Sequence, residues 1–244
     1  MAHGSRRAGT ALVRRLGLAL LPARCLVCGE SGDGGQDLCA ACRRELPWNH
    51  PACTRCALPL PGPGHCGACL AHPPPFDRAW AALHYRFPLD RLLPRFKFHA
   101  DLAAGRLLSQ LMREALVQAP LPQALVPVPL HPERLRQRGY DQALELARPL
   151  ARGFGLPLAA GVLRRVRATA AQSELGAGAR SHNVRGAFSA AAGALPDHVA
   201  LVDDVMTTGA TLRECARALR RAGVARVDLW AAARAPPPGH QASA

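Results

Sequence analysis

Hydrophobic residues recur along the chain at two spacings, the short period of strands and the longer period of helices. Three short apolar runs predict buried strands: residues 79–87, 199–202 and 224–233. Residues 101–118 carry apolar side chains at helical spacing and predict a helix. A second helix is expected after the run at 199–202, with Leu212, Cys215 and Leu219 on its apolar face and Gly223 at its end. Strands that alternate with helices predict an α/β fold, a parallel sheet covered by helices on both faces.

Other segments depart from this regular pattern. The stretch ALVPVPL at residues 124–130 is apolar, but its two prolines argue against an ordinary central strand. Asp141 is expected to cap a helix that reaches Leu146 or beyond, and Pro149 is expected to end or kink that helix early. Residues 167–183 are small, polar and glycine-containing, and predict a long mobile loop.

An apolar run near the N-terminus, Leu16 to Ala23, follows several arginines and is similar to a signal peptide. The run is short and contains Pro22, and Arg24 stands where a small residue should precede cleavage. We therefore expect a short amphipathic helix. The sequence has no stretch of about 18 consecutive apolar residues, so no transmembrane helix is expected and the protein is predicted to be soluble and cytoplasmic.

Eight of the nine cysteines form four CxxC pairs, and Cys215 stands apart from them. Repeated CxxC pairs are typical of zinc ribbons, in which two tight turns each offer two thiolates to one tetrahedral ion. Sequential pairing is the simplest arrangement, and crossed pairing stays open. The predicted ligands are Cys25, Cys28, Cys39 and Cys42 for one ion, and Cys53, Cys56, Cys66 and Cys69 for the other.

Four thiolates close the coordination sphere of Zn²⁺, so both ions are expected to be structural and the cysteines to require a reducing compartment. Redox catalysis by one CxxC pair is a less favoured alternative. Gly29, just after Cys28, and Gly67, inside the last pair, suit the positive φ angles that such turns demand.

Length and charge place further bounds on function. The chain has 244 residues, 49% of them hydrophobic, which is enough for one sizeable domain and a small one and excludes global disorder. The net charge of +14 falls to about +10 once two four-thiolate zinc sites are included. Lys97 is the only lysine, and the arginine excess in a chain rich in Ala, Gly and Pro can reflect genome composition as well as a nucleic-acid surface.

The segment DDVMTTGATL carries the strongest chemical signal outside the cysteines. It follows the predicted buried strand and opens a helix, the place where ligands bind in open α/β sheets. Small residues and hydroxyls at a helix N-terminus can cradle a phosphate, and two carboxylates can accept hydrogen bonds from sugar hydroxyls or bind Mg²⁺. A ribose 5-phosphate fits this set: Asp203, Asp204, Thr207, Thr208, Gly209, Ala210 and Thr211. The alternative to ligand binding is a purely structural role, in which one aspartate caps the helix.

This segment is similar to the phosphoribosyl-pyrophosphate motif of type I phosphoribosyltransferases. From Leu20 to Trp230 the chain resembles the ComF family, proteins linked to natural DNA uptake in bacteria. The resemblance is carried by the paired ribbons, by YRFPLDRLLPRFKF, by VPVPLHPERLRQRGYDQALELA and by AQSELGAGARSHNVRGAF. It implies a type I phosphoribosyltransferase-like fold behind a double zinc ribbon, with phosphoribosyl pyrophosphate as ligand and Mg²⁺ as its companion.

The resemblance also implies roles for single residues. The pyrophosphate loop would contain Val128, Pro129, Arg134 and Arg138. The loop that closes over substrate would contain Gln172, Arg180 and Asn183. Asp141 replaces the asparagine that is usual in the family, and its acidity favours a helix cap over anion binding. Lys97 can line the site or lie on the surface.

The implied domains are an N-terminal tail with a short helix (1–24), the double zinc ribbon (25–70), a proline-rich linker (71–75), the phosphoribosyltransferase-like domain (76–234) and a disordered tail (235–244). Two functions follow. One is a binding protein of DNA uptake, with single-stranded DNA or uptake proteins as partners. The other is an active phosphoribosyltransferase, with Asp203 and Asp204 as catalytic residues and an unidentified base or amine as acceptor.

Overall fold

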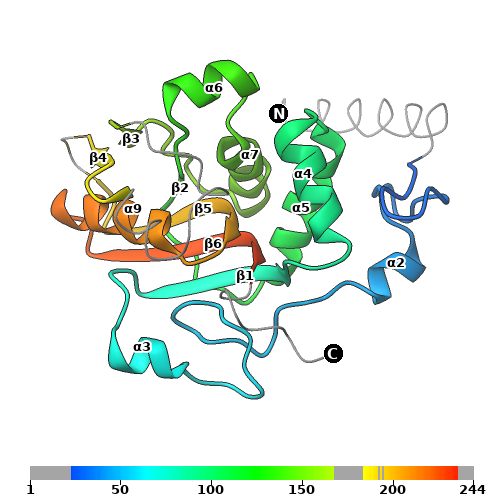
Figure 1. The fold of residues 1–244 in the computed structure, drawn as a ribbon, viewed down its shortest axis with the longest axis horizontal. Coiled ribbons are helices and arrows are strands. Elements are labelled where there is room, and N and C mark those ends of the chain that lie inside the picture. The colour runs from blue at the N-terminus through cyan, green and yellow to red at the C-terminus, as the bar shows by residue number, and fades with distance from the viewer. Residues whose placement is uncertain (1–22, 168–183, 192, 194, 236–244) are drawn as a thin grey trace, which may run out of the picture. The chain divides into compact units, whose positions relative to one another are not determined.

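The computed structural model of the chain describes residues 23–167, 184–191, 193 and 195–235 (Figure 1). The chain forms two compact units, Met1–Leu46 and Pro47–Ala244. The predicted N-terminal helix, the loop residues 168–183 and the tail from 236 lie outside the described residues.

The first unit is built around the first four cysteines. Its one described helix, α2 (Ala40–Arg44), begins after Cys39, whose sulfur accepts a hydrogen bond from the Cys42 N–H. The knuckle after Cys25 closes through a 2.9 Å hydrogen bond from the Gly29 N–H to the Cys25 carbonyl. Gly29 has a φ of +84°, as its place after Cys28 predicts.

The second unit contains a four-stranded parallel sheet of order β1-β6-β5-β2. Its strands are β1 (Arg78–His84), β2 (Ala124–Pro127), β5 (His198–Met206) and β6 (Arg226–Arg234). The three strands expected from the apolar runs are therefore present. The residues 124–130 also contribute a strand, but a short one at the edge of the described sheet, with Pro127 as its last residue.

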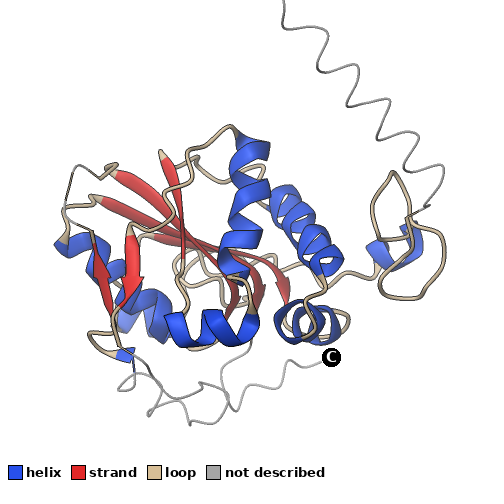
Figure 2. Ribbon diagram, turned by 90° about the horizontal axis from the view of Figure 1, so that it is seen from above, coloured by secondary structure: helices blue, strands red, loops and turns tan. Residues whose placement is uncertain are grey.

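Helices cover both faces of this sheet (Figure 2). One face carries α5 (Leu102–Ala115) and α7 (Gln142–Phe154), and the Phe154 ring lies 5.6 Å from that of Trp230. The other face carries α9 (Ala210–Arg221), whose Leu212, Cys215 and Leu219 are buried against the strands as predicted. The helix α9 ends at Arg221 with Ala222 as its C-cap, and Gly223 follows with a φ of +96°.

The expectation that Pro149 ends its helix early is wrong, because α7 continues through Pro149 to Phe154. Leu146, Ala147 and Leu150 are buried around the proline, and this burial outweighs one lost backbone hydrogen bond. Asp141 caps α7 as predicted, accepting a hydrogen bond from the Leu144 N–H.

Several elements were not predicted from the apolar pattern. They are α4 (Leu89–Phe98), α6 (Pro132–Arg138) and an antiparallel pair of short strands, β3 (Leu163–Arg165) and β4 (Phe188–Ala190). Each is short, and α4 contains Pro94. The sequence pattern is weak in these segments, because α6 and the two strands hold few periodic positions and Pro94 argues against a helix at α4.

The second cysteine quartet belongs to the unit that contains the sheet. Its four cysteines are buried in the same apolar core as Phe76, Ala79 and Ala81 of the first strand region. The short helix α3 (Gly67–Ala71) begins inside the last CxxC pair, so Gly67 is helical and the expectation of a positive φ there is wrong. The left-handed position falls instead on Ala57, just after Cys56, with a φ of +53°.

Candidate functional site

Strand β5 carries Asp203 and Asp204 close to its carboxyl end. Successive residues of a strand point to opposite faces of the sheet, so the two carboxylates do not lie side by side. Asp203 shares its face with Leu201 and with Cys215 of α9, and Asp204 points to the face on which α4 lies. The pair therefore offers one carboxylate on each side of the same strand end.

Asp204 is paired with the only lysine of the chain. Lys97 comes from the last turn of α4, and its Nζ lies 2.9 Å from Oδ2 of Asp204. The Asp204 side chain is only 5% exposed, and that of Lys97 is 24% exposed. Burial lowers the pKa of Lys97, but the two aspartates more than offset this, and the net shift is upward. Lys97 thus lines the site and is not a surface charge.

Among the residues that the structure describes, Asp203 forms no ion pair of this kind. Burial and the neighbouring Asp204 carboxylate raise its pKa to about 8, well above the ordinary value, although Lys97 and the Asp204 N–H oppose the shift. A cation or a hydroxyl donor close to this carboxyl group would stabilise its ionised form. A ligand that brings such a group to the end of β5 can therefore offset the unfavourable environment of the Asp203 carboxylate.

The residues after β5 form a tight cradle at the start of α9. Gly209 is the N-terminal cap, with a φ of +74° that favours glycine, and a Cβ there would approach the Met206 methyl to 3.2 Å. The Thr208 hydroxyl accepts a 3.4 Å hydrogen bond from the Ala210 N–H. A hollow of about 30 Å³ lies among Asp203, Val205, Thr207 and residues 209–212. A helix N-terminus with free backbone N–H groups and hydroxyls is suited to an anion.

A larger cavity of about 1100 Å³ opens beside this hollow. Its wall brings together residues from segments far apart in the sequence, including most of those that the sequence assigns to ligand binding. These are Val128, Pro129, Arg134, Arg138, Asp203, Asp204, Thr207 and Thr211. Gly209 and Ala210 line only the small hollow, and Thr208 lines neither. Gln172, Arg180 and Asn183 lie outside the described residues.

The wall also contains residues that sequence reasoning missed or left open. Lys97, Tyr85, Phe98, Tyr140 and Arg165 all line the cavity. The guanidinium of Arg138 lies 5.3 Å from the centre of the Phe98 ring, and the Phe98 side chain is 69% exposed. A lone aromatic residue gives no sequence signal, and Phe98 reaches the cavity as the last residue of α4, a helix that the apolar pattern did not predict.

Asp141 holds the predicted pyrophosphate loop to α7. One of its carboxylate oxygens accepts from the Leu144 N–H at 3.1 Å, and the other accepts from the Leu130 N–H at 3.2 Å. Arg138, at the end of α6, donates to the Gln142 side chain at 2.5 Å. The segment from Leu130 to Arg138 is therefore fixed at both ends against the start of α7.

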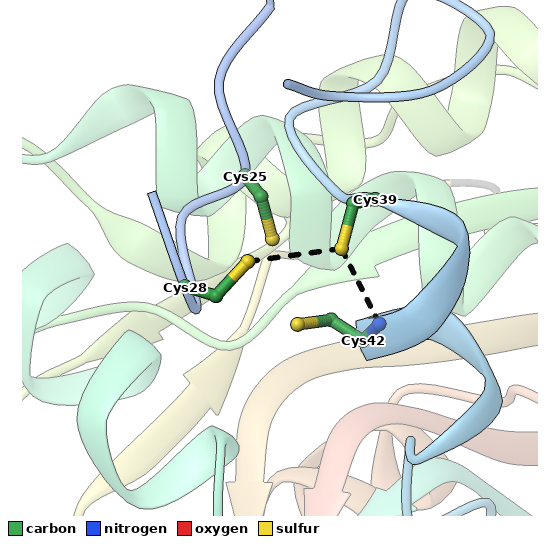
Figure 3. A group of neighbouring side chains, drawn as sticks. All are labelled: Cys25, Cys28, Cys39 and Cys42. Carbon is green, nitrogen blue, oxygen red and sulfur yellow. Dashed lines mark hydrogen bonds between the residues drawn. The ribbon is translucent and has the colours of Figure 1, made fainter. Parts of the chain in front are cut away.

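The eight cysteines form two separate groups, and the sequential pairing is confirmed. Within each group the four sulfur atoms lie within 4.8 Å of one another. Figure 3 shows Cys25, Cys28, Cys39 and Cys42 pointing to a common centre, with Cys28 and Cys39 sulfurs 3.7 Å apart. Four sulfurs in this arrangement match the ligand set of a structural zinc ion.

Burial and close neighbours shift the pKa values of the thiols in the second group in opposite directions. Burial raises the pKa of Cys53, but backbone N–H groups outweigh burial and lower it to about 6. Burial and the neighbouring thiols raise the pKa of Cys56 to about 11 and that of Cys69 further. Thiols crowded in this way suit a metal ion, because a bound cation would favour the thiolate form that coordinates it.

Comparisons with known proteins agree with this architecture. Residues 17–70 match the family described as "Double zinc ribbon domain", and residues 141–238 match "Phosphoribosyl transferase domain". The chain is 38% identical over 223 residues to Competence protein F of Haemophilus influenzae, covering 87% of this chain and 97% of that protein. It is 34% identical over 212 residues to DNA utilization protein YhgH of Escherichia coli K12, covering 82% and 92%. The same-named protein of Salmonella typhi is 38% identical over 204 residues, covering 81% and 90%.

None of the helices in the described part of the chain combines the length and the apolar character that crossing a membrane requires.

Proposed function

Because the chain belongs to the ComF family, we propose that it acts in DNA uptake and binds phosphoribosyl pyrophosphate through the segment from Asp203 to Thr211. The observation that carries the proposal is the cavity of about 1100 Å³, in which both carboxylates, Thr207 and Thr211 of the cradle, and several cationic side chains meet. A sugar carrying a phosphate at one end and a pyrophosphate at the other needs this combination of charges.

In this proposal the 5-phosphate lies on the backbone N–H groups of Thr207 to Thr211, at the positive end of α9. The ribose hydroxyls donate to the carboxylates at the end of β5. Arg134 and Arg138 of α6 face the pyrophosphate, since guanidinium groups bind phosphate oxygens in a bidentate manner. The loop Val128–Pro129 supplies the wall on that side.

The residues present fit Mg²⁺, which would reduce the negative charge of the pyrophosphate. Mg²⁺ prefers one or two carboxylates together with substrate phosphate oxygens and water. The Asp203 carboxyl lines the cavity and has a raised pKa, so a cation beside it is favourable. Asp204 is already compensated by Lys97, and it is better suited to orienting the sugar.

Calorimetric titration with phosphoribosyl pyrophosphate and Mg²⁺ tests the proposal. We expect binding by the wild-type protein and at least about a tenfold loss in Asp203→Asn/Asp204→Asn, the loss of one or two charge-assisted hydrogen bonds. Asp90→Asn, at an exposed position of α4, is the matched control. Equal affinity in all three proteins would contradict the site assignment.

We further propose that single-stranded DNA and proteins of the uptake machinery are the partners, and that the protein works in the cytoplasm, where reduced cysteines are maintained. The names of the relatives and the net charge of about +10 with both zinc ions support this. Single-strand binding should weaken steeply as salt rises from 50 to 200 mM, because counterions are released from the phosphates. Absence of binding at low salt would reject the DNA part of the proposal.

The cavity wall also favours a second candidate, an active phosphoribosyltransferase. Beyond the carboxylates the cavity is lined by Tyr85, Phe98 and Tyr140, which leaves an aromatic surface for an acceptor. Asp203 and Asp204 would then hold the ribose while pyrophosphate leaves. Pyrophosphate release in the presence of a panel of bases and amines tests this candidate, and a silent panel with intact binding would leave only the binding function.

A further inference from the structure

Arg234 connects two parts of the second unit that are distant in sequence. It is the last residue of β6, and only 6% of it is exposed. Its NH1 group donates to the carbonyls of Met206 at 3.0 Å and Thr207 at 2.6 Å, and also to that of Ala235. Its Nε group donates to the carbonyl of Cys56 at 3.0 Å. One buried guanidinium therefore ties the start of the ligand cradle to a knuckle of the second cysteine site.

Arg234 joins two segments whose backbone conformation matters, the start of the cradle and the turn at Cys56. Met206 and Thr207 lead directly into the residues that form the cradle, and the Ala235 N–H donates back to the Met206 carbonyl at 3.0 Å. Cys56 is itself a predicted metal ligand, and Ala57 behind it holds a left-handed backbone. Hydrogen bonds from the Ala57 N–H to the Cys53 carbonyl and from the Asn49 side chain to the Ala57 carbonyl hold this turn, and a bound ion would hold it further.

We propose that Arg234 makes the second cysteine site a support of the ligand cradle, so that loss of zinc from this site weakens ligand binding while loss from the first site does not. The inference rests on the proposed function in one respect: it takes the cradle to be the place where the sugar phosphate binds.

The bridge joins its two ends through the hydrogen bonds of one side chain. A zinc ion would hold the four sulfur atoms of the second site, and with them the Cys56 carbonyl, in one place. Without the metal this carbonyl is held less firmly, and a buried guanidinium that loses an acceptor is costly. The two segments that Arg234 joins are then expected to separate and admit water.

The first site provides a natural contrast. Cys25, Cys28, Cys39 and Cys42 lie in the unit Met1–Leu46, whereas the second quartet, Arg234 and the cradle all lie in Pro47–Ala244. The second quartet is wholly buried and continuous with the core under β5 and α9, but Cys28 of the first is exposed. In this proposal the second cysteine site supports the ligand cradle, and the first does not.

A matched pair of variants in the full-length protein tests the inference. Cys69→Ser and Cys42→Ser each remove the fourth ligand of one site, and each should reduce the zinc content by about one ion per chain. We expect Cys69→Ser to weaken phosphoribosyl pyrophosphate binding at least about tenfold, and Cys42→Ser to change it less than about twofold. A Cys69→Ser protein that is folded, lacks one zinc ion and binds as tightly as Cys42→Ser would overturn the proposal.

Hydrogen exchange over residues 206–211 gives a measurement that needs no ligand. During titration of the wild-type protein with a chelator, exchange there should accelerate as the second zinc ion leaves, and unchanged protection would overturn the inference. Arg234→Lys keeps all eight cysteines, so it should keep both zinc ions while accelerating exchange at 206–211 and weakening binding. If wild type binds no phosphoribosyl pyrophosphate, the proposed function fails, but the exchange measurement still decides whether the support exists.

Discussion

At the scale of single residues, the requirements of stability and of binding oppose each other at Asp203. The folded protein keeps a proton on this carboxyl up to a pKa of about 8, whereas an unfolded aspartate loses it near the ordinary value of 3.8. Between these values the folded state binds more protons than the unfolded state, so this residue makes stability fall as pH rises. A ligand that brings a cation or hydroxyls to Asp203 reverses part of that loss.

Asp203→Asn should therefore stabilise the ligand-free protein while weakening binding. We expect its melting temperature to exceed that of wild type by several degrees at pH 8.5, about 1 kcal/mol or more, and by less at pH 6. Melting curves over this pH range, in which the zinc thiolates stay bound, measure the effect. Asp90→Asn, in an exposed position, should leave the pH profile unchanged. A constant difference between wild type and Asp203→Asn across the range would contradict the prediction.

The two carboxylate oxygens of Asp141 accept hydrogen bonds from two different segments, at Leu130 and at Leu144. Substitutions can distinguish the contributions of these two hydrogen bonds. Asp141→Asn keeps an oxygen to cap α7 at the Leu144 N–H but replaces the oxygen that accepts from Leu130. Asp141→Ala removes both. We expect the alanine variant to lose about 1–2 kcal/mol of unfolding free energy and the asparagine variant about half of that. Both should show faster hydrogen exchange at the Leu130 amide, because both remove the carboxylate oxygen that accepts from it.

At the scale of elements, the success of sequence reasoning depends on how local each signal is. The cradle could be predicted because a strand, two aspartates and a run of small residues follow one another directly. The place of Lys97 could only be left open, since a helix that the apolar pattern does not reveal carries it to the sheet, where it pairs with Asp204. The role of Arg234 could not be predicted from the sequence. An arginine at the end of a strand is usually a surface charge, and the contact that defines its role is with Cys56, far away in the sequence.

Helix α7 shows how tertiary burial can override a local rule. Pro149 lies inside the helix and cannot donate a backbone hydrogen bond, yet the helix continues for five more residues to Phe154. Pro149→Ala restores the donor without adding bulk. We expect it to stabilise the protein by about 1 kcal/mol, less than the intrinsic preference because the unfolded chain also gains freedom. Denaturant unfolding measures this change, and a destabilised variant would mean that the proline ring itself fills space in the core.

At the scale of the whole molecule, the sequence motif and the compact units divide the chain differently. The sequence groups both ribbons at residues 25–70, and the resemblance to known families follows that grouping. By compactness the division lies between Leu46 and Pro47, which leaves the second ribbon with the sheet. The cause is burial: Cys53, Cys56, Cys66 and Cys69 share a core with Phe76 and the first strand, and Asn49 donates to the carbonyls of Ala57 and Ala81.

Two truncations distinguish these divisions. A fragment that begins at Pro47 retains the whole shared core, so we expect it to fold, bind one zinc ion and bind phosphoribosyl pyrophosphate about as tightly as the full chain. A fragment that begins at Ala71 exposes Phe76, Ala79 and Ala81 and removes the acceptor of the Arg234 Nε group. Because burial of one such side chain contributes about 1–3 kcal/mol and a domain is stable by only about 5–15 kcal/mol, the second fragment should aggregate or melt far below the first. Cooperative unfolding of both fragments at similar temperatures would show instead that the phosphoribosyltransferase-like domain is independent of both ribbons.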